Sequence, residues 1–69
     1  MMVMFSDAWI GELELSMPVA LNTDHIVDVH PVIHGDDKEC TVILSTGQMY
    51  TILGSLADVV AQINHAART

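Results

Sequence analysis

A stripe of apolar residues with helix-type spacing lies close to the C-terminal end of this chain. The residues that share the spacing i, i+3, i+4 and i+7 are Leu56, Val59, Val60 and Ile63. This stripe predicts an amphipathic helix over about residues 56–66. Ser55 is a good N-cap, and Asp58 three residues later completes a pair similar to a capping box. A single helix covers one side of a sheet, so a sheet formed by the preceding residues keeps a second side that needs another cover.

Strand-type patterns precede the helix. Residues 40–44 are β-branched and apolar, residues 45–48 favour a turn, and residues 49–53 supply a second strand. This order predicts a β-hairpin with 40–44 as a central strand. Two alternatives remain for the side that points away from the helix. It carries either Val42 or Ile43, and either Met49 or Tyr50.

The first part of the chain is harder to interpret. Apolar and acidic residues alternate over residues 9–17, which predicts a half-buried strand. A short helix starting near Ser6 is the competing interpretation, and Gly11 weakens it. Residues 19–21 favour a short extended piece, and residues 22–25 favour a turn because Asn and Asp side chains bond to nearby backbone.

Residues 26–34 predict another strand, with two different faces. One face holds Val27, Val29 and Ile33, and the other holds Asp28, His30, Val32 and His34. Pro31 cannot donate a ladder hydrogen bond, so this strand lies at a sheet edge or carries a bulge. A charged turn follows over residues 34–39. The expected fold is α+β: a small antiparallel sheet of four to five short strands, followed by one C-terminal amphipathic helix.

Length and charge restrict the class of protein. The chain has 69 residues, enough for one small domain over residues 1–69, and a net charge of −7 with only two basic residues. Direct binding to DNA or RNA needs clustered Lys and Arg, so it is not expected. Residues 1–39 carry the whole net charge, and residues 40–69 are neutral. Such asymmetry marks either an interaction face or a solubilising one.

The single cysteine bears on the expected cellular location of the protein. Cys40 has no internal partner, whereas secreted domains of this size usually carry several disulfides. A cytoplasmic location is therefore expected, with Cys40 as a buried, inert thiol rather than a nucleophile. The apolar start over residues 1–5 lacks a basic segment, so it does not fit a signal peptide, and no stretch is long enough to span a membrane.

Three stretches of the chain resemble the FlbD family of small flagellar proteins, also called SwrD in swarming motility. They are Leu21-Asn22-x-Asp24-x-Ile26, the run from Thr41 to Tyr50, and Ser55-x-x-Asp58-Val59-x-x-x-Ile63. Together the stretches span about residues 19–63. The resemblance implies a bacterial or phage protein without enzymatic activity, and it transfers no catalytic residues.

Asp28, His30 and His34 form the sharpest constellation of possible metal ligands. Strand positions i and i+4 are about 13 Å apart, which opposes a shared ion unless Pro31 bends the chain. We therefore expect no metal and no other cofactor, and treat these residues as solvent-facing. The four histidines also allow a pH switch as an alternative to ordinary surface residues.

The sequence supports two functional hypotheses, neither of them enzymatic. The apolar excess and the FlbD-like pattern favour a protein-interaction module that self-associates. The alternative is an acidic, phage-encoded inhibitor that occupies the basic surface of a nucleic-acid-binding protein. The methionines at 1, 2, 4 and 17 and Phe5 fit either a binding surface or core filling. The residues expected at the interaction surface are Trp9, Glu12, Glu14, Tyr50, Leu56 and Val60.

Overall fold

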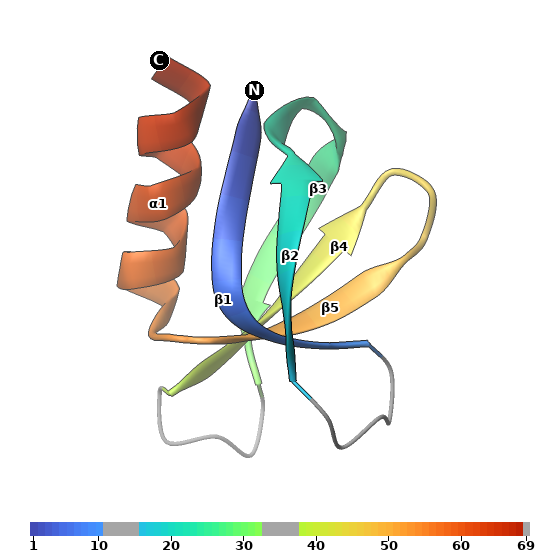
Figure 1. The fold of residues 1–69 in the computed structure, drawn as a ribbon, viewed down its shortest axis with the longest axis vertical. Coiled ribbons are helices and arrows are strands. Elements are labelled where there is room, and N and C mark those ends of the chain that lie inside the picture. Colours follow the sequence, from blue (N-terminus) through green and yellow to red (C-terminus); the bar gives the residue numbers. More distant parts are fainter. Residues whose placement is uncertain (11–15, 33–37, 69) are drawn as a thin grey trace.

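The structure, a computed structural model, describes residues 1–10, 16–32 and 38–68. It confirms the α+β class, with a five-stranded antiparallel sheet followed by one helix (Figure 1). The strands are β1 (Met2–Ile10), β2 (Met17–Asn22), β3 (Ile26–Pro31), β4 (Glu39–Leu44) and β5 (Met49–Leu53). A 3-10 turn, η1 (Thr23–His25), links β2 to β3, and the helix is α1 (Leu56–Arg68). The strand order is β2-β1-β5-β4-β3, so β5 lies at the centre.

The N-terminal segment differs from the sequence prediction. Residues 2–10 form a full strand, and Met17 begins a separate one, so the single strand predicted over residues 9–17 is wrong. Ala8 pairs with Met17 across antiparallel strands, which means that the chain reverses direction between them. The competing helix near Ser6 is also wrong, because Ser6 lies within β1. The alternation over residues 12–15 lies outside the described residues.

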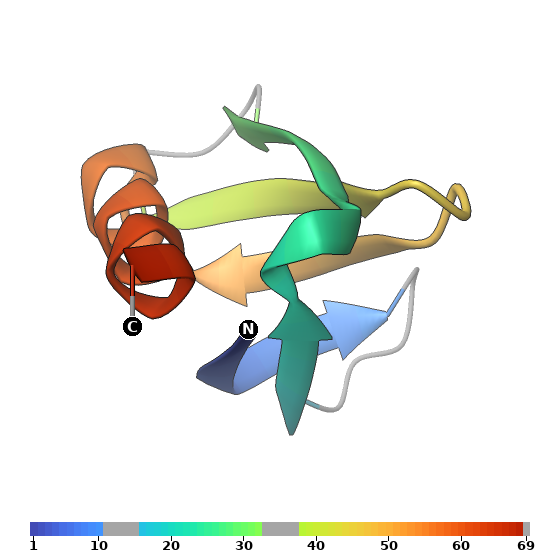
Figure 2. The same ribbon diagram turned by 90° about the horizontal axis from the view of Figure 1, so that it is seen from above.

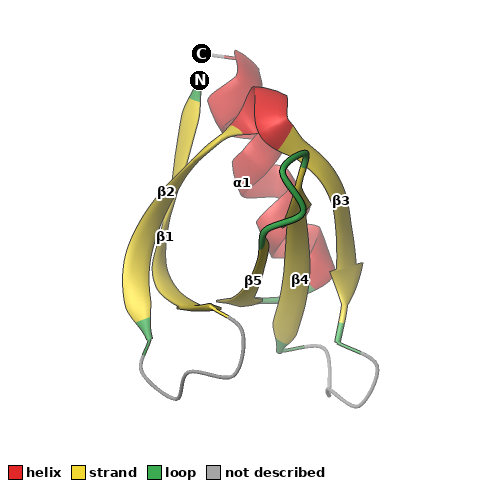
Figure 3. Ribbon diagram, turned by 90° about the vertical axis from the view of Figure 1, so that its right-hand side faces the viewer, coloured by secondary structure: helices red, strands yellow, loops and turns green. Residues whose placement is uncertain are grey.

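Two bulges bend the sheet around its core. The register of β1 against β2 shifts between Phe5 and Ala8, opposite Pro18, which has no N–H to donate. The register of β3 against β4 shifts between Ile26 and Asp28. Because bulges increase local twist and bend a strand, both outer strand pairs curl toward each other. Figure 3 shows the resulting arch, with η1 joining the two edge strands.

The bulge in β3 changes which of its residues face the core, so one predicted face is wrong. Val27 is 63% exposed, whereas Val29 and Ile26 pack against the core. Val27 and Val29 therefore do not share a buried face, since the inserted residue breaks the period of two. The prediction that Pro31 belongs to an edge strand is confirmed, because β3 is an edge strand that ends at Pro31.

The helix closes the concave side of the arch, where it contacts β1, β3, β4 and η1 (Figures 2 and 3). Its start is confirmed as predicted, because Ser55 Oγ accepts a hydrogen bond from the Asp58 backbone N–H at 3.2 Å. Val59 is fully buried, and Leu56, Ile63 and Ala66 pack beside it. Val60, which the predicted stripe includes, is 36% exposed and lies at the margin of the buried side.

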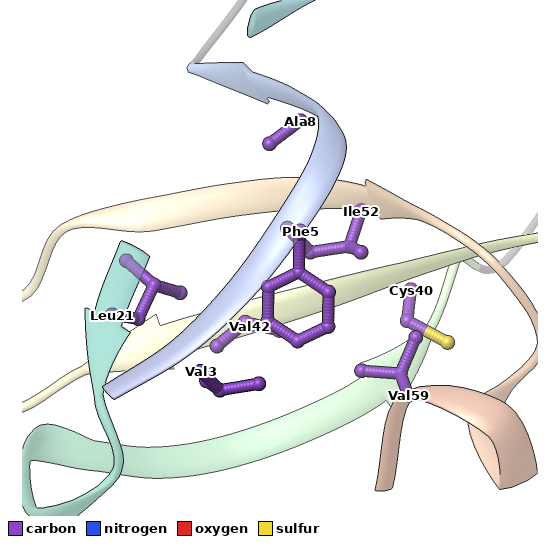
Figure 4. Packing of buried hydrophobic residues seen from close by; sticks show 8 residues of the cluster. All are labelled: Val3, Phe5, Ala8, Leu21, Cys40, Val42, Ile52 and Val59. Carbon is purple, nitrogen blue, oxygen red and sulfur yellow. The ribbon is translucent and has the colours of Figure 1, made fainter. Parts of the chain in front are cut away.

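One apolar core occupies the concave side. It consists of Val3, Phe5, Ala8, Leu21, Cys40, Val42, Ile52 and Val59 (Figure 4). All of these except Val59 come from strands, so the helix contributes one fully buried side chain and a flanking row of half-buried ones. The hairpin predicted over residues 40–53 is confirmed, with Gly47 at φ 92° in its turn.

Candidate functional site

The convex side of the sheet carries the strand residues that alternate with those of the core. Strand register places four of them in one row across the sheet. Trp9 of β1 pairs with Thr51 of β5, Thr51 pairs with Thr41 of β4, and Thr41 pairs with His30 of β3. Directly paired residues on one face of a sheet have side chains within contact distance, so this row is a continuous strip of surface.

Two shorter rows flank the first. On one side, Met49 pairs with Ile43, and Ile43 pairs with Asp28; on the other side, Leu53 pairs with Glu39. We call the three rows together the outer face. It consists of Trp9, Asp28, His30, Glu39, Thr41, Ile43, Met49, Thr51 and Leu53. The alternatives left open by the sequence are thereby settled: Ile43 and Met49 lie on the outer face, whereas Val42 is buried and Tyr50 packs against the core.

The outer face has two threonines at its middle, apolar side chains around them, and ionisable side chains toward one edge of the sheet. Met49 is 51% exposed and Leu53 is 52% exposed, while Trp9 and Ile43 are half-buried. The ionisable side chains, Asp28, His30 and Glu39, belong to the edge strand β3 and its neighbour β4. Large apolar and aromatic side chains such as Trp9, Met49 and Leu53 are enriched in protein interfaces, whereas ionisable side chains lie mainly at the rim.

Asp28 and His30 form a direct pair on the margin. Asp28 Oδ2 lies 3.0 Å from His30 Nδ1, and both side chains are about half exposed, at 57% and 44%. The prediction that these two residues share a solvent-facing side is confirmed. His34, the third member of the predicted constellation, lies outside the described residues. Within the described ranges, no group of three or more His, Cys, Asp and Glu side chains could hold a metal ion.

The residues expected at the interaction surface do not gather in one place. Trp9 lies on the outer face, whereas Tyr50 and Leu56 pack against the core from the other side of the sheet. Val60 lies on the helix. Glu12 and Glu14 lie outside the described residues, as do Asp36 and Asp37. Cys40 is fully buried, as predicted, and its Sγ donates a hydrogen bond to the Gly54 carbonyl oxygen at 3.4 Å.

The sequence interpretation missed the two threonines at the middle of the outer face. Thr41 and Thr51 pair directly, between Trp9 on β1 and His30 on β3. Sequence alternation could have identified both threonines, because each stands between core-facing residues of the predicted hairpin. Thr41 stands between Cys40 and Val42.

Comparisons with protein-family models, with curated proteins and with solved structures find no match to this chain. In the part of the chain that the structure describes, no helix is long and apolar enough to cross a membrane. Function therefore has to be argued from the outer face itself.

Proposed function

We propose that this chain is a small, non-enzymatic protein-interaction module that self-associates through the outer face. The observation that carries the proposal is a set of four apolar side chains, Trp9, Ile43, Met49 and Leu53, around the Thr41–Thr51 pair on the side of the sheet opposite the core. The helix packs on the opposite, concave side (Figure 3). Exposed apolar side chains grouped on one face favour an interaction site in a soluble protein.

A second copy fits this surface in size. The two longer dimensions of the molecule are 31 and 22 Å. A specific interface at the small end of the range buries about 600 Å² per partner, which is comparable to one side of such a molecule. Two sheets can pack face to face at about 10 Å, with side chains from both interdigitating.

Charge also favours this part of the surface over others for self-association. Two copies with a net charge of −7 repel each other. The centre of the outer face is uncharged, so contact there brings no acidic side chains directly together. Of the acids at the margin, Asp28 lies 3.0 Å from the His30 ring nitrogen, and Glu39 directly follows Lys38 in the sequence. We place the module in the cytoplasm of a bacterium or phage-infected cell, in keeping with the FlbD-like resemblance.

The test compares two methionine substitutions that add the same charge at different places. Met49→Glu puts a carboxylate among the apolar side chains of the outer face, whereas Met4→Glu puts it on β1, paired with Ala20 of β2. Both methionines are at least half exposed, so both variants are expected to fold. Sedimentation equilibrium over micromolar concentrations should show dimers for the parent and for Met4→Glu, and monomers for Met49→Glu. A parent chain that stays monomeric, or equal loss in both variants, would refute the proposal.

Salt separates self-association from the alternative of an acidic inhibitor. Screening weakens repulsion between two acidic copies, so the dimer should become tighter from low to high ionic strength. Binding of an acidic chain to a basic protein surface would weaken over the same range. Sedimentation in 20 mM and 500 mM NaCl would therefore distinguish the two functions.

A further inference from the structure

All five methionines of the chain lie at its surface. Their exposed fractions are 52% for Met1, 57% for Met2, 72% for Met4, 38% for Met17 and 51% for Met49. Methionine is ordinarily among the residues most often buried, and here the core is built from other residue types. The thioether sulfurs are thus accessible from solvent.

Three of these methionines are within the first four residues, and two of them share one side of β1. Met2 and Met4 are exposed and alternate with Val3 and Phe5, which are buried. Residues i and i+2 of a strand lie about 7 Å apart on the same face. Methionine is unbranched and has three rotatable side-chain bonds, so two sulfurs with this spacing can reach a single ion.

The backbone beneath this pair is held on both sides. Met2 pairs with Asn22 and Met4 pairs with Ala20 in the β1–β2 ladder. The Met1 carbonyl oxygen accepts hydrogen bonds from the Thr23 backbone N–H at 2.8 Å and from Thr23 Oγ1 at 3.2 Å. Met1 is therefore anchored next to the pair, and its thioether is a third candidate ligand.

The donor set selects one chemical class of ligand. Thioethers are soft, neutral ligands that favour Cu(I), whereas carboxylates and carbonyls favour hard cations such as Mg²⁺ and Ca²⁺. The first acidic residue of the chain is Asp7, and the cross-strand neighbours Asn22 and Ala20 are uncharged. We propose that Met2 and Met4, with Met1 as a third ligand, form a surface binding site for Cu(I). This site is separate from the outer-face centre and does not depend on self-association.

The remaining methionines provide matched controls within the same molecule. Met17 pairs with Ala8, four residues beyond Met4 along β1, and Met49 lies on β5. Each is an exposed methionine without a second one at position i+2. Accessibility alone would therefore make all five respond equally, whereas a site requires Met2 and Met4 to respond together.

The experiment is a Cu(I) titration of untagged protein, without oxygen and with [methyl-¹³C]methionine labelling, followed by NMR. Intact mass first verifies that Met1 is present. The Met1, Met2 and Met4 methyl signals should shift together and saturate at one ion per chain, while those of Met17 and Met49 stay in place. The isosteric variants Met2→Leu and Met4→Leu keep the apolar surface, and each should weaken Cu(I) binding by about tenfold or more because a soft ligand is lost. Met17→Leu should bind as the parent does.

Uniform shifts of all five methyl signals, or no saturation at one equivalent, would overturn the proposal. So would unchanged Cu(I) affinity in both leucine variants. Sedimentation of the same variants reports separately on the proposed function, since Met2→Leu and Met4→Leu should leave self-association intact.

Discussion

The two sides of strands β4 and β5 differ sharply in burial. On the concave side, Cys40, Val42 and Ile52 are at most 1% exposed, because the arch and the helix enclose them. On the convex side, Met49 and Leu53 are about half exposed although they lie on the same strand as Ile52. Because side chains alternate between the two faces of a strand, one helix can bury only one face of the sheet. The difference indicates that the concave side determines stability, whereas the convex side is available for contact with another molecule.

The largest contrast is expected between neighbouring residues on β5. Ile52→Ala removes three carbon atoms from the closed core and should lower the free energy of unfolding by about 2–4 kcal/mol. Leu53→Ala, one residue later on the outer face, should cost less than about 1 kcal/mol because its side chain is half exposed. Urea unfolding followed by circular dichroism measures both values. Equal losses at the two positions would contradict the division into two sides.

The hairpin and the helix could be predicted because their signals are local. The turn over residues 45–48 and the Ser55 cap each depend on side chains next to the backbone that they shape. Alternation alone left open whether Val42 or Ile43 is buried, since a period of two is the same for both faces. The choice depends on where the helix packs, which is a tertiary contact.

The N-terminal strand could not be predicted in the same way. Its two inward residues Val3 and Phe5 precede a bulge, and the bulge shifts the period before Ala8. Pro18 lies opposite the bulge on the partner strand and has no N–H to donate, but this matters only once β2 pairs with β1. Likewise, the outer face assembles residues from four strands, and Trp9 meets Thr51 only through a register that no short segment specifies.

Substitution of Gly54, at the junction between β5 and the helix, tests how closely the helix packs on the concave side. Gly54 has φ 147°, and a Cβ atom there would lie 3.3 Å from Val59 Cγ2. Gly54→Ala should therefore cost about 1–3 kcal/mol through backbone strain and displacement of a buried side chain. Gly47→Ala should cost only about 1 kcal/mol, since its φ is 92° but a Cβ atom meets nothing within 4 Å. Thermal unfolding of both variants gives the comparison, and a larger loss at Gly47 would contradict it.

The N-cap of the helix is expected to contribute less to the free energy of unfolding than the close packing at Gly54. Ser55→Ala removes the acceptor for the Asp58 N–H and should lower stability by about 1 kcal/mol. Ser55→Asp retains an acceptor and should remain close to the parent in the same urea titration. If alanine and aspartate behave alike at this position, the cap does not stabilise the helix as the geometry implies.

The smallest effect is expected at the margin of the outer face. Asp28→Asn removes the negative charge that faces His30 Nδ1 at 3.0 Å, but both side chains are about half in solvent. Exposed ion pairs contribute little because water and salt screen them, so the change in unfolding free energy should stay within about 0.5 kcal/mol. Self-association should also persist, since the pair lies on the edge strand β3, which supplies none of the four apolar side chains. Urea unfolding and sedimentation of this single variant test both statements. A loss above about 1 kcal/mol would mean that part of the convex side, too, contributes to holding the fold together.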